Sequence, residues 1–459
     1  MDSVPAYIQK NRQRFIEELV EFLKIPSISA KSERKADCEK AAHFLADQFR
    51  GLGLQTEIRP TTGHPVVIAR SASVANKPTI LIYGHYDVQP EEPLDLWKSP
   101  PFEPRIEGEN IFARGATDDK GQVFAHIKAV EAHIKSGGVL PVNVIFLIEG
   151  EEEVGSNHLD TFIKENRNQL KSDVALVSDS SQFAPGLPSL CYGLRGICGE
   201  EIRVVGASHD LHSGSFGGAV PNPANILCEI IGRLKDEKNR VTIPGFYDEV
   251  LPLESWEKKA FAALPWDDEK YRKELGLSAL HGEEGFTTLE RKWARPTLDV
   301  NGIFGGYSGE GGKTVIPSWA GAKITMRLVP NQKPETIHER FRAYIQQLAP
   351  PSVRIEFPAH GGCGPALVPR SAPFIDEAVD ALTRGFGAKP VFIREGGSIP
   401  VVLTFKEELG LNTLLLGYGL PDDNMHAPNE KFSLKDFERG IQTSAWFFQL
   451  CGSRCLMDR

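Results

Sequence analysis

The chain has 459 residues, of which 41% are hydrophobic and 25% are charged, and its formal net charge is −9. This composition excludes a disordered, collagen-like or coiled-coil protein, and the length predicts two or three globular domains at roughly 150 residues each. The excess of acidic residues makes nucleic acid and anionic membranes unfavourable partners, so we expect neither.

The beginning of the chain predicts an amphipathic helix rather than a signal peptide, because apolar residues recur at helical spacing between charges over residues 1–29. No apolar run approaches the roughly 20 residues needed to span a bilayer. The cysteines form no Cys-x-x-Cys pair, so we expect no disulfide framework and a cytoplasmic location. They are Cys38, Cys191, Cys198, Cys228, Cys363, Cys451 and Cys455.

Three short β-branched-rich runs predict buried strands at Pro78–Tyr83, Val142–Ile148 and Asp173–Val177. Helical patterns follow at Gln122–Lys135 and Leu159–Gln169. Strands that alternate with helices predict an α/β fold with a mostly parallel sheet flanked by helices.

After about residue 198 polar and apolar residues alternate, which is typical of half-buried antiparallel strands, so we expect residues 198–360 to form a second, inserted α+β domain. The α/β pattern then returns, and residues 1–197 and 361–459 are expected to form the first domain. The segment 244–295 yields no prediction. The further elements are strands at 201–205, 323–329 and 411–416 and helices at 222–234, 334–348, 372–384 and 434–450.

Residue types that bind metals follow four predicted strands at their carboxyl ends. In chain order these are Gly84-His85-Tyr86-Asp87, Glu149-Gly150-Glu151-Glu152-Glu153, Ser178-Asp179 and a loop that holds His426. Ligands bind outside the carboxyl ends of strands in open α/β sheets. We therefore expect these groups to converge, although they extend from position 85 to position 426.

Each of these pieces has a simpler explanation when taken alone. A single histidine after a strand is more often a structural residue, and the run of glutamates at 149–153 would usually be a solvated charge run. Asp118-Asp119-Lys120-Gly121 is a turn signal, or equally a helix N-cap, because a predicted helix follows it directly. Only the ordered combination indicates a site.

In this order the residues resemble the M20 family of co-catalytic metallopeptidases, over nearly the whole chain, and most of all its cytosolic dipeptidase and carnosinase-like branch. The resemblance implies an enzyme whose inserted domain is a lid and dimerisation domain. The matching motifs are 84–90, 114–121, 149–156, 178–179, 192–196, 210–214, 313–317, 394–400 and 426–430.

The resemblance also implies two divalent metal ions per subunit. His85 and Asp179 would be terminal ligands of one ion, Glu153 and His426 those of the other, and Asp118 the bridging carboxylate. Such a mixed oxygen and nitrogen set suits Zn²⁺ or Mn²⁺ and does not distinguish them. Two such ions polarise the scissile carbonyl and acidify a bridging water that acts as the nucleophile.

Other roles are implied by the same motifs. Glu152 would be the general base and acid, and Asp87 would hold the tautomer of the neighbouring histidine ligand. The peptide bond between Asp118 and Asp119 would be cis. His212 would stabilise the oxyanion in the site of the partner subunit of a homodimer, although by itself it also fits a surface histidine beside a Ser-Gly turn.

The resemblance implies a dipeptide substrate. Within the family an Asp at the place of Asp179 goes with aminopeptidases and dipeptidases, and a Glu with carboxypeptidases and N-deacylases. For Arg327 a solvent-facing strand charge is the alternative. The implied substrate contacts are Arg327, Thr314, His360, Gly397 and Ser398.

Three other functions stay open at this point. An N-acyl-amino-acid or carbamoyl amidohydrolase of the same family is the main alternative to a dipeptidase. A mononuclear hydrolase would differ in metal content per chain. A non-catalytic protein that kept the fold is disfavoured, because all five ligand positions and Glu152 are present.

Overall fold

The computed structural model describes residues 3–454, so Cys455 lies outside the described residues. These residues divide into two compact units. The first comprises 3–192, 368–393 and 400–454, and the second comprises 193–367 and 394–399. Within residues 3–454, no helix combines the length and the apolar character that a membrane span requires.

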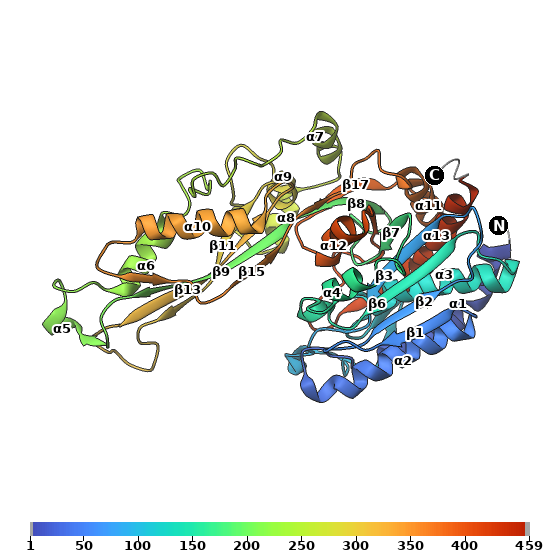
Figure 1. The fold of residues 1–459 in the computed structure, drawn as a ribbon, viewed down its shortest axis with the longest axis horizontal. Helices are drawn as coiled ribbons and strands as arrows, with labels where there is room; N and C mark the ends of the chain where they lie inside the picture. Colours follow the sequence, from blue (N-terminus) through green and yellow to red (C-terminus); the bar gives the residue numbers. More distant parts are fainter. Residues whose placement is uncertain (1–2, 455–459) are drawn as a thin grey trace. The chain divides into compact units, whose positions relative to one another are not determined.

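The first unit is built on a mixed sheet with the strand order β1-β2-β6-β3-β7-β18-β8-β16, in which β17 also pairs with β8 (Figure 1). The central strands β6, β3, β7 and β18 are mutually parallel. The pairs β1–β2, β2–β6, β18–β8 and β8–β16 are antiparallel. The predicted α/β class is thus confirmed, with parallel pairing at the centre of the sheet.

The central strands form because each is a nearly continuous apolar run, which suits a strand that is buried on both faces. Every residue of β7 and β18 is buried. A separate small sheet has the order β19-β5-β4. The strands are β1 Gln55–Arg59, β2 Val66–Arg70, β3 Thr79–His85, β4 Arg105–Glu107, β5 Asn110–Phe112, β6 Asn143–Glu149, β7 Val174–Val177, β8 Ser189–Leu194, β16 Ala366–Leu367, β17 Val391–Glu395, β18 Thr413–Leu416 and β19 Lys431–Ser433.

The helices of this unit pack in two groups. Helices α1, α3, α13 and α11 contact one another in that order, and α4 contacts α12. The expected N-terminal helix is α1, whose apolar residues Ile8, Phe15 and Leu19 are buried on one side. The helices are α1 Ser3–Leu23, η1 Ser32–Arg34, α2 Lys35–Gly51, η2 Leu94–Leu96, α3 Lys120–Gly137, η3 Glu152–Val154, α4 Leu159–Glu165, α11 Ile375–Phe386, α12 Pro400–Leu409 and α13 Leu434–Ser453.

The second unit is an antiparallel sheet of order β11-β13-β9-β14, with β15 also pairing β9 (Figure 1). Strand β9 alternates between buried and half-buried residues along its length, as its sequence predicts. Its buried side forms one core with β13, α6 and α10. The strands are β9 Gly196–Val205, β10 Leu211–His212, β11 Thr297–Gly305, β12 Val315–Ile316, β13 Trp319–Leu328, β14 Arg354–Glu356 and β15 His360–Cys363.

The helices of the second unit include three in the segment for which the sequence yields no prediction. These short helices, α7, α8 and α9, begin at ordinary capping residues: Thr287, for example, accepts a hydrogen bond from the backbone N–H of Glu290. The helices are α5 Ser213–Phe216, α6 Pro223–Gly232, α7 Ser255–Ala262, α8 Asp268–Glu274, α9 Thr288–Trp293 and α10 Pro334–Leu348.

The two units divide the chain a few residues away from the expected boundaries. Residues 193–197 and 361–367 group with the second unit, because β9 begins at Gly196 and β15 pairs with it. Residues 394–399 also group with it, although the sequence places them in the first domain. Hydrogen bonds with Arg195 hold this segment, including one from its Nε to Gly396 O at 3.2 Å. The catalytic and lid roles of the two units stay predictions.

Candidate active site

The four central strands of the first unit end beside one another, and each is followed by polar residues predicted to form a site. The register places His85 of β3 opposite Glu149 of β6. Val177 of β7 pairs with Tyr83 on one side and with Leu415 of β18 on the other. The loops that carry Glu153, Asp179 and His426 therefore start from one edge of the sheet, as the sequence predicts.

Asp118 lies where these loops meet. Its Oδ1 is 3.2 Å from His85 Nε2, and its Oδ2 is 2.9 Å from His426 Nε2. Ligand atoms of His85, Asp118 and Asp179 lie within 4.8 Å of one another, and so do those of Asp118, Glu153 and His426. The chain thus forms two adjacent three-residue groups that share one carboxylate.

The loop that carries Asp118 is held by a carboxylate from far along the chain. Glu430 Oε1 accepts hydrogen bonds from the backbone N–H groups of Thr117 and Asp118, at 3.0 and 3.1 Å. Its Oε2 accepts from Gly115 N at 2.9 Å and from Arg114 Nη1 at 2.8 Å. The bond between Asp118 and Asp119 is cis, as the resemblance implies.

Asp87 is fully buried and connects the loops after β3 and β6. Its Oδ1 lies 3.4 Å from His85 Nδ1 and accepts a hydrogen bond from Glu152 N at 3.3 Å. Its Oδ2 accepts from Glu153 N at 3.1 Å. The backbone oxygen of Asp87 lies 3.1 Å from the same Nδ1. These contacts to Nδ1 leave Nε2 of His85 directed at Asp118.

The acidic groups in this cluster disfavour one another's charge. Burial, and then repulsion by neighbouring carboxylates, raises the pKa of Glu152, Glu153 and Asp179. Burial opposes ionisation of Asp118 as well, but the close contacts of its two oxygens with His426 and His85 outweigh it and lower the pKa of Asp118. A cluster of buried carboxylates of this kind favours a bound cation.

The donor atoms fit a metal centre. Among residues 3–454 no group makes a hydrogen bond with His85 Nε2 or with Glu153 Oε1, and both atoms are buried. Such unsatisfied buried atoms are costly unless something else binds them. Two imidazoles and three carboxylates form a donor set suited to divalent ions such as Zn²⁺ and Mn²⁺.

Glu152 differs from its neighbours in this cluster. Its backbone is held by Asp87, but no residue in the described part of the chain hydrogen-bonds or ion-pairs with its carboxylate. The adjacent Glu153 accepts a hydrogen bond from Gln89 Nε2 at 2.7 Å and lies 3.4 Å from His426. Glu152 therefore presents a carboxylate that is free to exchange a proton.

The predicted site residues of the second unit form two close pairs. Arg327 Nη1 donates a hydrogen bond to Ser398 Oγ at 3.1 Å. His212 Nε2 lies 3.4 Å from Thr314 Oγ1, and the backbone N–H of Gly214 donates to His212 Nδ1 at 3.0 Å. Because Nδ1 is the acceptor, the proton of the neutral ring is on Nε2.

The other two predicted contacts of this unit are open to solvent or to a ligand. His360 on β15 is exposed, and its ring lies edge-to-face with that of His338 at 5.3 Å between centroids. A Cβ added at Gly397 would meet no atom within 4 Å. Packing therefore does not explain the glycine at 397.

Sequence reasoning missed two residues that support the site. Gln89 and Glu430 both lie within motifs of the family resemblance, which assigned them no role. Gln89 orients Glu153, and Glu430 orients the backbone around Asp118. Nothing in a single sequence pairs Glu430 with a loop more than 300 positions away.

Comparison with known proteins decides the family. The model of peptidase family M20/M25/M40 matches residues 81–449, which include the predicted metal ligands and Glu152. The chain belongs to this family. The predicted M20 membership is thereby confirmed, and with it the predicted enzyme class of metallopeptidase.

Relatives along the full length of this M20 protein include two dipeptidases. It is 34% identical over 459 residues to the Cys-Gly metallodipeptidase dug1 of Schizosaccharomyces pombe, with 96% of each chain covered. It is 30% identical over 466 residues to the human Beta-Ala-His dipeptidase, covering 98% of this chain and 92% of the relative.

A solved structure also matches the fold of this M20 protein. The M20 family metallo-carboxypeptidase Sso-CP2 from Sulfolobus solfataricus is 35% identical, with a TM-score of 0.86 and coverage of 95% of this chain and 99% of that one. The two dipeptidases are named after different dipeptides, Cys-Gly and Beta-Ala-His, and Sso-CP2 is named only as a carboxypeptidase. The identity of the residues cleaved is therefore a separate question from the reaction.

Proposed function

We propose that the protein is a metal-dependent dipeptidase that hydrolyses dipeptides or short peptides with a free amine and a free carboxylate. The observation that carries this proposal is Asp118, which contacts His85 and His426 from opposite oxygens and belongs to both ligand groups. A carboxylate shared between two groups is the arrangement that a dinuclear centre needs.

Two divalent ions, Zn²⁺ or Mn²⁺, are proposed as cofactors. His85 and Asp179 would hold one, Glu153 and His426 the other, and Asp118 both. When bound, such ions polarise the scissile carbonyl and lower the pKa of a water molecule. The atoms left without a hydrogen bond, His85 Nε2 and Glu153 Oε1, support this assignment.

Glu152 is proposed to transfer the proton. Its carboxylate, which has no partner within residues 3–454, would accept a proton from the attacking water and return it to the leaving amine. Burial raises the pKa of Glu152, which favours its holding a proton between these two steps. Asp87 would keep Glu152 in place through the hydrogen bond that it accepts from the backbone N–H of Glu152.

The ends of the substrate are assigned to different groups. Arg327 and Ser398 would contact the substrate carboxylate, since the guanidinium presents several donors to one anion and its Nη1 is held 3.1 Å from the Ser398 hydroxyl. His360 is exposed, and Gly397 has no atom near the place of a Cβ, so both would contact the same substrate molecule. Asp179 favours a substrate with a free amine through the family association alone.

His212 is proposed to act in the site of a partner subunit, in a homodimer formed through the second unit, and Thr314 beside it is proposed as a substrate contact. The ring of His212 is exposed and carries its proton on Nε2, so it can donate to an oxyanion.

Together with the absence of any membrane-spanning helix among residues 3–454, the scattered cysteines favour a cytoplasmic location.

A carboxypeptidase acting on longer peptides is a second candidate, because of the 35% identity with Sso-CP2. An N-acyl-amino-acid or carbamoyl amidohydrolase has no comparable support. A substrate panel separates the three: dipeptides, N-blocked dipeptides, longer peptides and N-acyl amino acids, each with Zn²⁺ and with Mn²⁺. Preferential cleavage of unblocked dipeptides supports the proposal, and preferential cleavage of any other class contradicts it.

A further inference from the structure

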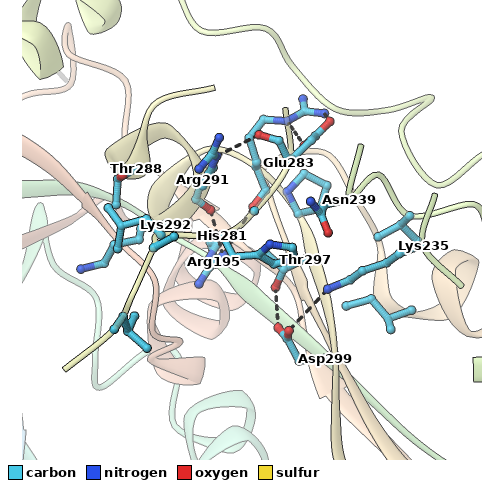
Figure 2. Close-up of a pocket in the computed structure, with 18 of the residues that line it drawn as sticks. Arg195, Lys235, Asn239, His281, Glu283, Thr288, Arg291, Lys292, Thr297 and Asp299 are labelled. Atoms are coloured by element: carbon cyan, nitrogen blue, oxygen red, sulfur yellow. Dashed lines mark hydrogen bonds and ion pairs between the residues drawn. The ribbon is translucent and has the colours of Figure 1, made fainter. Parts of the chain in front are cut away.

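A pocket of about 440 Å³ lies wholly within the second unit, and none of the candidate metal ligands is among its lining residues (Figure 2). Its lining comes from the segment after α6, from α8 and the segment between α8 and α9, from α9 itself and from the start of β11, together with Arg195. Figure 2 draws Arg195 among these lining residues. Arg195 is the only lining residue that precedes β9 in the chain.

The guanidinium of Arg195 binds backbone carbonyl groups rather than a carboxylate. Its Nη1 lies 3.5 Å from Arg291 O and 3.4 Å from Arg295 O, near the end of α9. Its Nε donates to Gly396 O at 3.2 Å. Carbonyl groups at a helix C-terminus carry partial negative charge, which suits a cation.

The backbone of Arg195 binds the same segment, residues 394–399. Arg195 N donates to Glu395 O at 3.2 Å, and Arg195 O accepts a hydrogen bond from Ser398 Oγ at 2.6 Å. Ser398 Oγ in turn accepts from Arg327 Nη1. One residue thus connects the end of α9 with the pair of groups proposed to bind the substrate carboxylate.

The fit between Arg195 and this segment is close. A Cβ added at Gly396 would lie 2.9 Å from Arg195 Nη2 and 3.1 Å from Lys292 O. A side chain at position 396 would therefore push Arg195 and the end of α9 away from this segment. Burial, and then the charge of Arg327, lower the pKa of Arg195 to about 10, so that it stays protonated at neutral pH beside a second cation.

We propose that Arg195 is a positioning residue for recognition of the substrate carboxylate: its guanidinium holds the segment 394–399 beside the end of α9, and this keeps the Ser398 hydroxyl on the Arg195 carbonyl and beside the guanidinium of Arg327. Its positive charge also strengthens the local field that an anion meets. The inference rests on the proposed function, in which Arg327 and Ser398 contact the carboxylate. It adds a residue that touches no substrate atom and acts through those two.

The test compares a dipeptide with the same dipeptide amidated at its C-terminus, using the wild type and the Arg195→Gln, Arg195→Lys and Arg291→Gln variants. For Arg195→Gln we expect KM for the free dipeptide to rise about tenfold, with kcat changed less than about threefold and KM for the amide little changed. Arg195→Lys keeps the charge and should fall in between. Arg291→Gln keeps the backbone carbonyl that Arg195 binds and should match the wild type.

A double-mutant cycle shows whether Arg195 acts through Ser398. The losses of binding caused by Arg195→Gln and Ser398→Ala should be strongly non-additive, because Ser398→Ala removes the hydroxyl that Arg195 is proposed to position. Amide hydrogen exchange in residues 394–399 should accelerate in Arg195→Gln and not in Arg291→Gln. This measurement does not depend on activity and also identifies a variant that simply fails to fold.

The possible failures are distinguishable. A wild type that cleaves no dipeptide overturns the proposed function. A wild type that cleaves free and amidated dipeptides equally well overturns carboxylate recognition and this inference with it. If the wild type prefers the free carboxylate and Arg195→Gln keeps the full preference, or if both substrates lose rate equally, Arg195 has no positioning role and the inference is wrong.

Discussion

Glu430 and Arg114 are 316 positions apart in the chain, and their side chains form a buried ion pair with 2.8 Å between Oε2 and Nη1. Both side chains are 1% exposed. The same carboxylate accepts three backbone hydrogen bonds from the segment that ends at Asp118. The position of Asp118, the proposed shared metal ligand, thus depends on a residue that belongs to neither ligand group.

We predict that Glu430→Gln destabilises the protein by about 3–5 kcal/mol, because Arg114 is left as an unpaired buried charge and the new amide group faces other donors. Urea denaturation in the presence of a chelator measures this without a contribution from metal binding. Glu438→Gln is the matched control, since Glu438 forms a partly exposed pair with Arg12 and should cost less than about 1 kcal/mol. Equal costs for the two variants would contradict the role given to Glu430.

Metal content should depend on which ligand is removed. We predict that a dialysed wild type retains about two ions per chain, that Asp179→Ala retains about one, and that Asp118→Ala retains almost none, because only Asp118 belongs to both groups. Elemental analysis measures the stoichiometry. Asp160→Asn, which alters a carboxylate hydrogen-bonded to Thr404 in the same unit, serves as the control and should retain both ions. One ion in the wild type would show a mononuclear centre.

Glu152→Gln should abolish turnover without loss of metal. Loss of a general base typically costs roughly 10²–10⁴-fold in rate. The neighbouring Glu151→Gln removes a carboxylate that pairs with His158 instead, and we expect its rate to stay within about threefold of the wild type. Metal content and kcat are measured on the same samples. Near-wild-type turnover in metal-replete Glu152→Gln would remove Glu152 from the reaction.

Stability at mildly acidic pH should depend on His126. This ring is fully buried, with Nε2 2.9 Å from Ser178 Oγ and Nδ1 2.9 Å from Ser444 Oγ. Burial lowers its pKa to about 3, below the ordinary value of 6.5, so at pH values between these two the unfolded state binds a proton that the folded state excludes. The contribution is therefore complete above pH 6.5 and decreases as the pH falls towards 3.

The free energy of unfolding should accordingly fall by up to about 1.4 kcal/mol per pH unit below pH 6.5 from this group alone. His126→Gln lacks the titrating ring, so the difference in stability between the wild type and this variant should shrink from pH 7.5 to pH 5. Urea denaturation of both proteins across this range measures the difference. A difference that does not change with pH would show that folding leaves the pKa of His126 unshifted, and a difference that grows would show that the folded protein binds the proton.

If His212 acts in the partner subunit, two inactive variants should complement each other. A mixed dimer of His212→Ala and Glu152→Gln chains holds one site with both functional residues and one with neither. Activity after subunit exchange should approach about a quarter of the wild-type value, because half of the dimers are mixed and half of their sites are intact. No recovery, or full activity in a strictly monomeric protein, would show that His212 does not act in trans.

The parts of the site that the sequence predicts are those that follow strongly apolar strands. An apolar run such as that of β6 predicts a buried strand, and the residue types just after it predict a site. The region around Glu152 and the place of Asp179 can therefore be predicted from the sequence alone. The antiparallel strands at the edges of the sheet cannot be predicted in this way. Strand β1, Gln55–Arg59, has no buried residue and shows no clear pattern.

Other features depend on contacts that no local pattern reveals. The segment 394–399 groups with the second unit because hydrogen bonds to Arg195 hold it, across about 200 positions of sequence. The helices α7, α8 and α9 are six to eight residues long, too short for a hydrophobic period to stand out. The role of Glu430 likewise follows from geometry alone.

The place of β18 between β7 and β8 has a consequence for synthesis of the chain. Strands β7 and β8 are close in sequence, whereas β18 follows them only after the second unit has been made. At about 5–20 residues per second, the ribosome takes on the order of ten to fifty seconds to add the intervening residues. During that interval the backbone edge of β7 has no strand to pair with, and such an edge is a template for aggregation. The nascent chain therefore carries an unpaired β7 edge throughout synthesis of the second unit, which comes almost entirely from one continuous segment.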